Sequence, residues 1–232
     1  MWCLLAAQLI DDVKAFIHDK FQIKDLGLLK YFLGLEVARS ADGIFLNQRK
    51  YALDMLTDYN FMECKPISTP MESKHNLGIS SAPLILDAAV YRRLVGRLIY
   101  LTITRPDLAF PVHVLSQFMQ APTQDHLKAA HRVLRYIKLA PAQGLIFPSA
   151  NDLCLVAYCD ADWASCPVTH RFVTGYCMML GNSLISWKAK KQVVVARSSS
   201  ESEYRPYISA PVYAYCDNQA ALHIAKNPVF HE

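Results

Sequence analysis

The chain has 232 residues, 53% of them apolar and only 8 of them glycine, and its formal charge at neutral pH is +4. This composition excludes a disordered chain and indicates one large or two ordinary packed domains. The apolar run over residues 1–7 is too short to span a bilayer and lacks the basic flank of a signal peptide. We therefore expect an intracellular protein, cytoplasmic or nuclear, with no membrane partner and no obligatory protein partner.

The seven cysteines form no Cys-x-x-Cys pair, and no histidine stands at the spacing that completes a zinc site. Several lie in apolar, strand-like stretches, where cysteine usually acts as a small hydrophobic residue. The sequence therefore predicts buried intracellular thiols rather than disulfides or metal ligands.

Helical and extended patterns alternate in the first third of the chain. Val13, Phe16, Ile17 and Phe21 keep helical spacing after Asp11 and Asp12, which suits the positive end of a helix dipole. The following elements are predicted to be a β-hairpin over 31–39 and 44–48 joined by Ser-Ala-Asp-Gly, a helix over about 50–59 with Leu53, Met55 and Leu56 inward, and a proline-containing loop or linker over 64–83.

Three further helices are predicted over about 88–104, 107–119 and 123–139. Pro106 ends the first, the second starts or kinks near Pro111, and Thr123 is an N-cap candidate for the third. The apolar face of the third helix consists of Leu127, Ala130, Val133, Leu134 and Ile137.

Basic residues gather on these helices. Residues 92–138 contain eight lysines and arginines but only two acidic residues, Asp107 and Asp125. Lys128, Arg132 and Arg135 are spaced i, i+4, i+7, so they lie along one exposed stripe. Such a stripe can follow a phosphate backbone, and the alternative is an ordinary solvated helix face.

From residue 151 onward the pattern is three short strands, a helix, a strand and a helix. The strands are expected at 153–160, 172–180, 183–189 and 212–217, and the helices after Ser198–Ser200 and over 218–227. An incomplete mixed sheet with flanking helices follows the mainly helical first part, and the fold class is therefore α+β or α/β.

Two strands of this part end in the same phrase, Ala-Tyr-Cys-Asp, at Asp160 and Asp217. If these strands are neighbours in one sheet, their carboxylates emerge at the same edge, and a glutamate from "SSSESEY" completes a cluster of three. Carboxylates crowded in this way fit Mg²⁺ or Mn²⁺. The alternatives are a turn at "DAD" and a simple helix cap at "SSSE".

Six stretches of the sequence carry a family resemblance. They are "YRRLVGRLIYLTITRPDLAF", "HLKAAHRVLRYIK", "AYCDADWASCP", "TGYCMMLGNSLISWKAKKQ", "RSSSESEYR" and "YCDNQAALHIAKNPVFHE". Together they resemble the downstream part of the Pol polyprotein of copia-type LTR retrotransposons. The resemblance implies the C-terminal part of a reverse transcriptase over 1–150, with a hairpin similar to the primer grip followed by thumb and connection helices, and an RNase H-like domain over 151–232.

The resemblance also implies a set of site residues. Asp160, Glu203 and Asp217 match the RNase H carboxylates that hold two Mg²⁺ ions for hydrolysis of the RNA strand of an RNA/DNA hybrid. Glu203 is chosen over Glu201 because Tyr204 follows it, and Asp162 becomes a supporting or turn residue. The hybrid, or another nucleic acid, is the expected partner, bound through Arg93, Arg97, Lys128, Arg132 and Arg135.

Three departures from the family pattern set the expectations for activity. The Tyr-x-Asp-Asp motif of the polymerase is absent, so DNA synthesis is not expected. Only 13 residues separate Glu203 from Asp217, a span that Pro206 and Pro211 break further. The chain also stops before the family's fourth carboxylate. Two hypotheses for the function follow: an RNase H-type enzyme, or an inactive fragment that at most binds nucleic acid through its basic helices.

Overall fold

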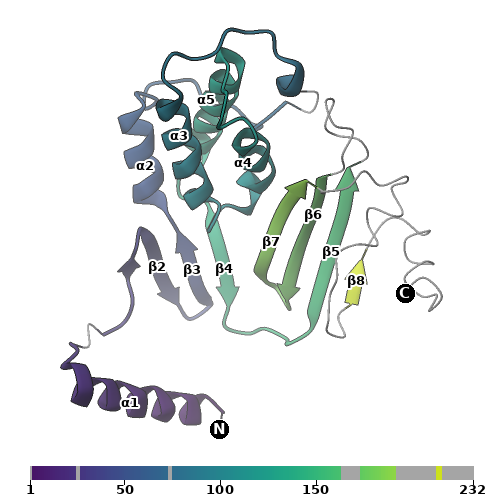
Figure 1. The fold of residues 1–232 in the computed structure, drawn as a ribbon. Coiled ribbons are helices and arrows are strands. Elements are labelled where there is room, and N and C mark those ends of the chain that lie inside the picture. The colour runs from purple at the N-terminus through teal and green to yellow at the C-terminus, as the bar shows by residue number, and fades with distance from the viewer. Residues whose placement is uncertain (1, 25–26, 73–74, 163–172, 192–212, 216–232) are drawn as a thin grey trace.

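The computed structural model describes residues 2–24, 27–72, 75–162, 173–191 and 213–215 (Figure 1). Its helices are α1 (Trp2–Phe21), α2 (Arg49–Asp58), α3 (Ala88–Leu101), α4 (Ala109–Ser116) and α5 (Gln124–Leu139), with 3-10 turns at Leu77–Ile79 and Pro106–Leu108. Its strands are β1 (Tyr31–Phe32), β2 (Leu35–Ser40), β3 (Gly43–Asn47), β4 (Gly144–Pro148), β5 (Leu155–Asp162), β6 (Val173–Leu180), β7 (Ser183–Lys191) and β8 (Tyr213–Tyr215). The predicted α+β class is confirmed. The helices expected after Ser198 and over 218–227 lie outside the described residues.

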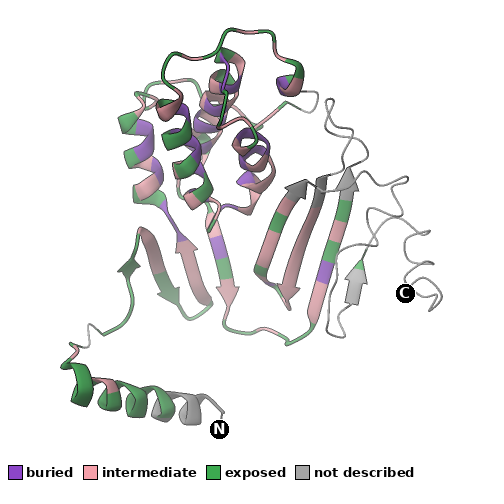
Figure 2. Ribbon diagram, in the orientation of Figure 1, coloured by how far each residue is buried: buried purple, intermediate pink, exposed green. Residues whose placement is uncertain are grey.

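Helices α2 to α5 enclose the main hydrophobic core, and Figure 2 shows buried residues on their facing sides. The three predicted helices of this region are confirmed as α3, α4 and α5. Pro111 lies in the first turn of α4, where a missing backbone N–H costs no helical hydrogen bond. Met55 and Leu56 of α2 are fully buried and Leu53 is partly buried, as their spacing predicts.

Thr123 is the N-cap of α5, as predicted, and the cap is completed by a residue whose role the pattern did not indicate. The backbone N–H of Thr123 donates to Nδ1 of the buried His126 at 2.8 Å, and the Nε2 of His126 lies 3.0 Å from the carbonyl oxygen of Leu77. This pattern fits the tautomer with its proton on Nε2, which donates to Leu77. His126 therefore fixes the start of α5 and holds the preceding loop on it.

The first sheet has the order β1-β2-β3-β4 and is antiparallel throughout. The predicted hairpin is confirmed as β2 and β3, which turn between Ser40 and Gly43. Gly43 has φ +148, and a Cβ there would collide with the backbone of Phe147. Strand β4 is the edge strand beside β3. The sequence did not predict it, and it lies about one hundred residues further along the chain.

Helix α1 corrects the first predicted element. It begins at Trp2, so Asp11 and Asp12 lie in its middle rather than at its positive end. The alanines and leucines of residues 4–9 are strong helix formers and extend the helix towards the N-terminus. Within the described part of the chain, no helix is long and apolar enough to cross a membrane.

The second sheet has the order β7-β6-β5-β8. Strands β5, β6 and β7 are antiparallel neighbours, and β8 runs parallel to β5. The helical layer meets this sheet at β7, where the Trp187 indole donates to the carbonyl of Thr102 at 3.1 Å. Strand β5 therefore lies two strands away from the helix-facing edge (Figure 1).

This arrangement corrects the expectation of buried cysteines. Cys154 is exposed, and Cys64, Cys159 and Cys177 are only partly buried. Three of these four belong to β5, β6 or the residue before β5, where the described helices do not cover the sheet. The prediction of buried thiols is therefore wrong for the four cysteines whose side chains are described.

Candidate nucleic-acid interface and metal site

Asp160 lies inside strand β5 rather than at its end. It pairs with Gly175 of β6, and the strand continues to Asp162, opposite Val173. The interpretation of "DAD" as a turn is therefore wrong, because pairing with β6 keeps this stretch extended. Asp160 is exposed, and a Cβ built on Gly175 would meet no atom of the described residues within 4 Å. The carboxylate of Asp160 thus has open space beside it over β6.

Strand β8 is the parallel neighbour of β5, which is the arrangement that the repeated Ala-Tyr-Cys-Asp phrase required. Ala157 pairs with Ala214 and Tyr158 with Tyr215, and the two tyrosine rings stack with centroids 5.3 Å apart. Asp160 follows Tyr158 by the same two positions by which Asp217 follows Tyr215 in the sequence. The pairing of Tyr158 with Tyr215 therefore aligns the two copies of the phrase, in each of which an aspartate follows the tyrosine by two residues.

The metal site predicted from the sequence has three carboxylate ligands. Asp160 is described, whereas Glu203 and Asp217 lie outside the described residues. Among the described residues, no group of three histidine, cysteine or acidic side chains is placed to hold a metal ion. The predicted donor set consists of carboxylates alone, and such a set fits Mg²⁺ or Mn²⁺ better than a softer metal.

The predicted basic stripe lies on α5, but it is less free than its spacing indicated. Lys128 pairs with Asp125 at 3.2 Å, Arg132 pairs with Glu72 at 3.1 Å, and Arg135 donates to the carbonyl of Lys65 at 2.8 Å. Lys128 keeps 76% of its side chain exposed, whereas Arg132 keeps only 30%. The prediction of an exposed stripe is therefore wrong for Arg132 and Arg135, which are only partly exposed, because residues 64–72 lie along α5 and supply acceptors to them.

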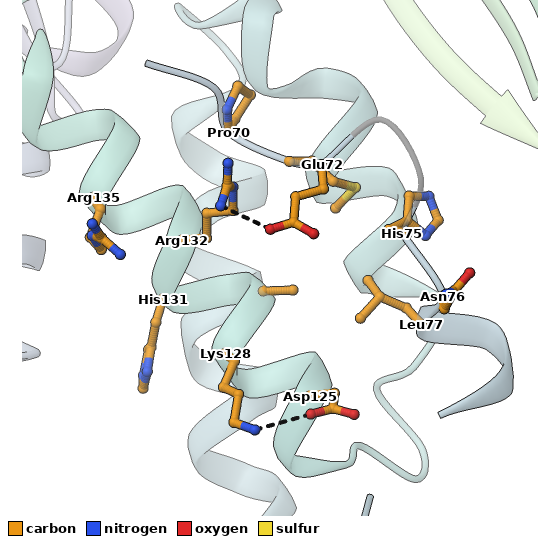
Figure 3. A pocket seen from close by; sticks show the side chains of 12 residues that line it. Pro70, Glu72, His75, Asn76, Leu77, Asp125, Lys128, His131, Arg132 and Arg135 are labelled. Atoms are coloured by element: carbon orange, nitrogen blue, oxygen red, sulfur yellow. Dashed lines mark hydrogen bonds and ion pairs between the residues drawn. The ribbon is translucent and has the colours of Figure 1, made fainter. Parts of the chain in front are cut away.

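A cavity of about 560 Å³ opens between α5 and residues 70–72 and 75–77, and Lys128, Arg132 and Arg135 all line it (Figure 3). The two arginines and the lysine share it with Glu72 and Asp125. Three of the five predicted nucleic-acid-binding residues therefore meet at one concave surface.

The other two predicted contact residues, Arg93 and Arg97, lie on α3. Arg93 is exposed. Arg97 pairs with Asp58 of α2 at 2.6 Å and lies over the rings of Tyr51 and Tyr59, at 5.4 and 5.8 Å from their centroids. Arg97 therefore belongs to a cluster between α2 and α3, apart from the cavity lining.

Arg105 does not contribute to the basic surface, although it counts among the eight basic residues of 92–138. Its side chain is 1% exposed, donates to both carboxylate oxygens of Asp107, and reaches the carbonyl of Ala140 at 2.9 Å. The surface of this region therefore has one basic residue fewer than the sequence count indicates.

Acid is expected to destabilise the helical core through its histidines. Burial lowers the pKa of His131, which packs against Phe61 with ring centroids 4.9 Å apart, and burial also lowers the pKa of His75. Between these lowered values and the ordinary 6.5, the unfolded chain binds more protons than the folded chain. The stabilisation is thus complete above this window and is lost as the pH falls through it.

We expect the urea concentration at the unfolding midpoint to decrease as the pH is lowered from about 7.5 to about 5.5. His131→Leu is expected to weaken this dependence. An equally steep dependence in the variant would contradict the assignment to His131.

Sequence reasoning missed the residues that 70–72 and 75–77 contribute to the cavity, among them Glu72 and His75. Thr69 accepts from Nη2 of Arg132 at 2.9 Å, and Glu72 accepts from Nη1. The prolines of residues 64–72 correctly indicated a loop. Nothing in its spacing indicated which helix it lies against.

Comparison with known proteins gives one family match and several long alignments. The family model of the reverse transcriptase (RNA-dependent DNA polymerase) matches residues 5–73. The chain is 40% identical over 235 residues to the retrovirus-related Pol polyprotein from transposon RE1 of Arabidopsis thaliana, with 93% of this chain and 16% of that protein aligned. It is 30% identical over 256 residues to the Pol polyprotein from transposon TNT 1-94 of Nicotiana tabacum, with 96% of this chain and 19% of that protein aligned.

A shorter relative aligns over most of its own length. The uncharacterized mitochondrial protein AtMg00810 of Arabidopsis thaliana is 44% identical over 189 residues, which cover 82% of this chain and 78% of that protein. The chain thus spans less than a fifth of the Pol polyproteins but most of this relative. No solved structure matches the chain.

Proposed function

This chain belongs to the family of copia-type retrotransposon Pol polyproteins and contains a reverse transcriptase-like segment, and from this premise we propose that it is an RNase H-type ribonuclease. Residues 1–150 correspond to the C-terminal part of the reverse transcriptase, and residues 151–232 to the RNase H-like domain. The substrate is the RNA strand of an RNA/DNA hybrid.

One observation carries this proposal. The strand of Asp160, β5, has β8 as its parallel neighbour, in a register with the same spacing as the two aspartates. If this pairing continues for two residues, Asp217 comes to lie opposite Asp160. Two carboxylates on adjacent parallel strands, joined by Glu203 from the helix predicted after Ser198, form the predicted donor set.

Asp160, Glu203 and Asp217 would hold the Mg²⁺, which would supply an activated water and charge neutralisation at the phosphate. Asp160 offers an exposed carboxylate with open space over Gly175, so a phosphate group can approach it from that side. The stacked Tyr158 and Tyr215 rings are 48% and 56% exposed. Strand alternation puts Tyr158 on the same face as Asp160, where an aromatic ring can support a sugar or base.

The direct test is incubation of the purified chain with an end-labelled RNA/DNA hybrid in Mg²⁺, beside the same reaction in EDTA. The proposal expects cleavage of the RNA strand only in Mg²⁺, and no cleavage of double-stranded DNA. Absence of cleavage in Mg²⁺ or Mn²⁺ would overturn the enzymatic proposal.

A second candidate function is nucleic-acid binding without catalysis, and the convergence of Lys128, Arg132 and Arg135 on one cavity favours it. Each phosphate contact contributes about 0.7–0.9 to the slope of log affinity against log salt. Replacing all three residues by glutamine is therefore expected to lower that slope by about 2–3 for a hybrid.

The control is a variant with the same loss of charge on α1 and the residues after it, with Lys14, Lys20 and Lys24 replaced by glutamine. These lysines are exposed, and α1 lies away from α5 (Figure 1). An equal change of slope in both variants would show that net charge acts rather than the cavity, and would contradict this candidate.

A further inference from the structure

The guanidinium of Arg132, at the cavity beside α5, already donates to oxygen acceptors in the way it would donate to a phosphate. Arg132 donates from Nη1 to the carboxylate of Glu72 at 3.1 Å and from Nη2 to the hydroxyl of Thr69 at 2.9 Å. Figure 3 shows Glu72 reaching across the opening to Arg132. A guanidinium fork binds carboxylate and phosphate oxygens with the same geometry.

Two buried polar atoms at this cavity are unsatisfied. Nε of Arg132 and Nδ1 of His75 have no hydrogen-bond partner among the described residues. Both residues line the cavity. Buried polar atoms in native proteins nearly always have a partner, so an unsatisfied pair at one concave surface points to a ligand with several acceptor atoms.

The two members of the Arg132–Glu72 pair are held very differently. Glu72 is 68% exposed, whereas Arg132 is 30% exposed and is also anchored by Thr69. An exposed ion pair contributes little to stability, so Glu72 can swing into solvent at small cost while Arg132 stays in place. Lys128 and Arg135 then lie one turn before and one turn after Arg132 on α5, and the lining carries excess positive charge.

We propose that this cavity is a phosphate-binding site and that Glu72 is an internal carboxylate that occupies it until a phosphate group displaces it. The site requires no metal and does not involve Asp160. The proposal deepens the second candidate function, nucleic-acid binding. It rests on that function only if the phosphate comes from nucleic acid, because a free phosphate offers the same chemistry.

The test titrates the full chain with inorganic phosphate, without Mg²⁺, and follows the Nε–H signal of Arg132 by NMR. Glu72→Gln removes the competing carboxylate and is expected to tighten phosphate binding about two- to fivefold, the weight of one exposed ion pair. Arg132→Gln is expected to weaken binding about tenfold or more, the weight of a hydrogen bond to a charged group.

Asp58→Asn is the charge-matched control for Glu72→Gln. This substitution removes the carboxylate of Asp58, on α2, that pairs with Arg97 on α3, and both residues lie outside the cavity lining. The proposal expects phosphate affinity to change less than in Glu72→Gln. Equal gains in the two variants, no gain in Glu72→Gln, or an unmoved Nε–H signal would overturn it. A gain of affinity cannot arise from misfolding, so this arm remains decisive if Arg132→Gln is unstable.

A second arm identifies the source of the phosphate and separates this proposal from the function above. Single-stranded RNA hexamers with and without a 5′-phosphate are titrated into the original chain and Glu72→Gln. Tighter binding of both hexamers in Glu72→Gln assigns the site to backbone phosphates, and a gain confined to the phosphorylated hexamer assigns it to a terminal phosphate. A response to inorganic phosphate alone keeps the site and removes nucleic acid as its source, while the hybrid cleavage result stands independently.

Discussion

Asp160→Asn is expected to lower Mg²⁺-dependent hybrid cleavage by about 1,000-fold. The substitution keeps the size and the strand geometry but removes the negative charge that would hold the cation. Metal-assisted stabilisation of the transition state supplies several kcal/mol, which corresponds to a factor of this size in rate. Initial rates of RNA-strand cleavage, measured at saturating hybrid, give the comparison.

Two further variants make this result specific to position 160. Asp152→Asn removes an exposed carboxylate just before β5 and is expected to leave the rate within about twofold, because screening weakens distant surface charges. Asp162→Asn changes the carboxylate two residues further along β5. A loss confined to Asp160→Asn supports its role as a ligand, whereas equal losses in all three variants would indicate that only the local field matters.

Asp107→Ala is expected to lower the free energy of unfolding by about 3 kcal/mol, the largest effect on stability that we anticipate from a single charged residue. The reason is the burial of its partner: Arg105 is 1% exposed and donates to both oxygens of Asp107. Without Asp107 the guanidinium keeps the carbonyl of Ala140 and the ring of Tyr136, whose centroid lies 5.6 Å from it, but no carboxylate among its described partners. A charge left buried with so little compensation is costly.

The matched control is Asp58→Ala, the same substitution at an exposed partner of another arginine. Asp58 is 59% exposed, so its loss is expected to cost no more than about 1 kcal/mol. Urea unfolding of both variants measures the two costs. A cost for Asp107→Ala that is no greater than for Asp58→Ala would contradict the argument from burial.

Local sequence was sufficient for most of the described elements. The positions of Pro106 and Pro111 bounded α3 and α4, one apolar face identified α5, and Thr123 marked its start. The alternation around Ser-Ala-Asp-Gly identified β2 and β3. These features depend on residues a few positions apart, whose periodicity is visible in the sequence itself.

The repeated Ala-Tyr-Cys-Asp phrase shows how far sequence reasoning reached towards the candidate metal site. It suggested that two distant strands are neighbours, and β5 and β8 pair in parallel as required. It misjudged where the first strand ends, because the pairing of β6 with residues 161 and 162 extends β5 past Asp160. Strand ends depend on the neighbouring strand, which composition does not specify.

The sequence by itself therefore determined the family, helices α2 to α5, the hairpin and the candidate ligands, because each of these depends on residue identity or on short-range spacing. Only the tertiary structure decided that β4 closes the first sheet, that Arg105 is buried on Asp107, and that Glu72 is paired with Arg132. The pairing of β4 and the Arg132–Glu72 ion pair join segments that are far apart in the sequence, and the burial of Arg105 depends on segments that pack over it. Whether a charge is free, paired or buried follows from that packing, and charge spacing along one helix does not encode it.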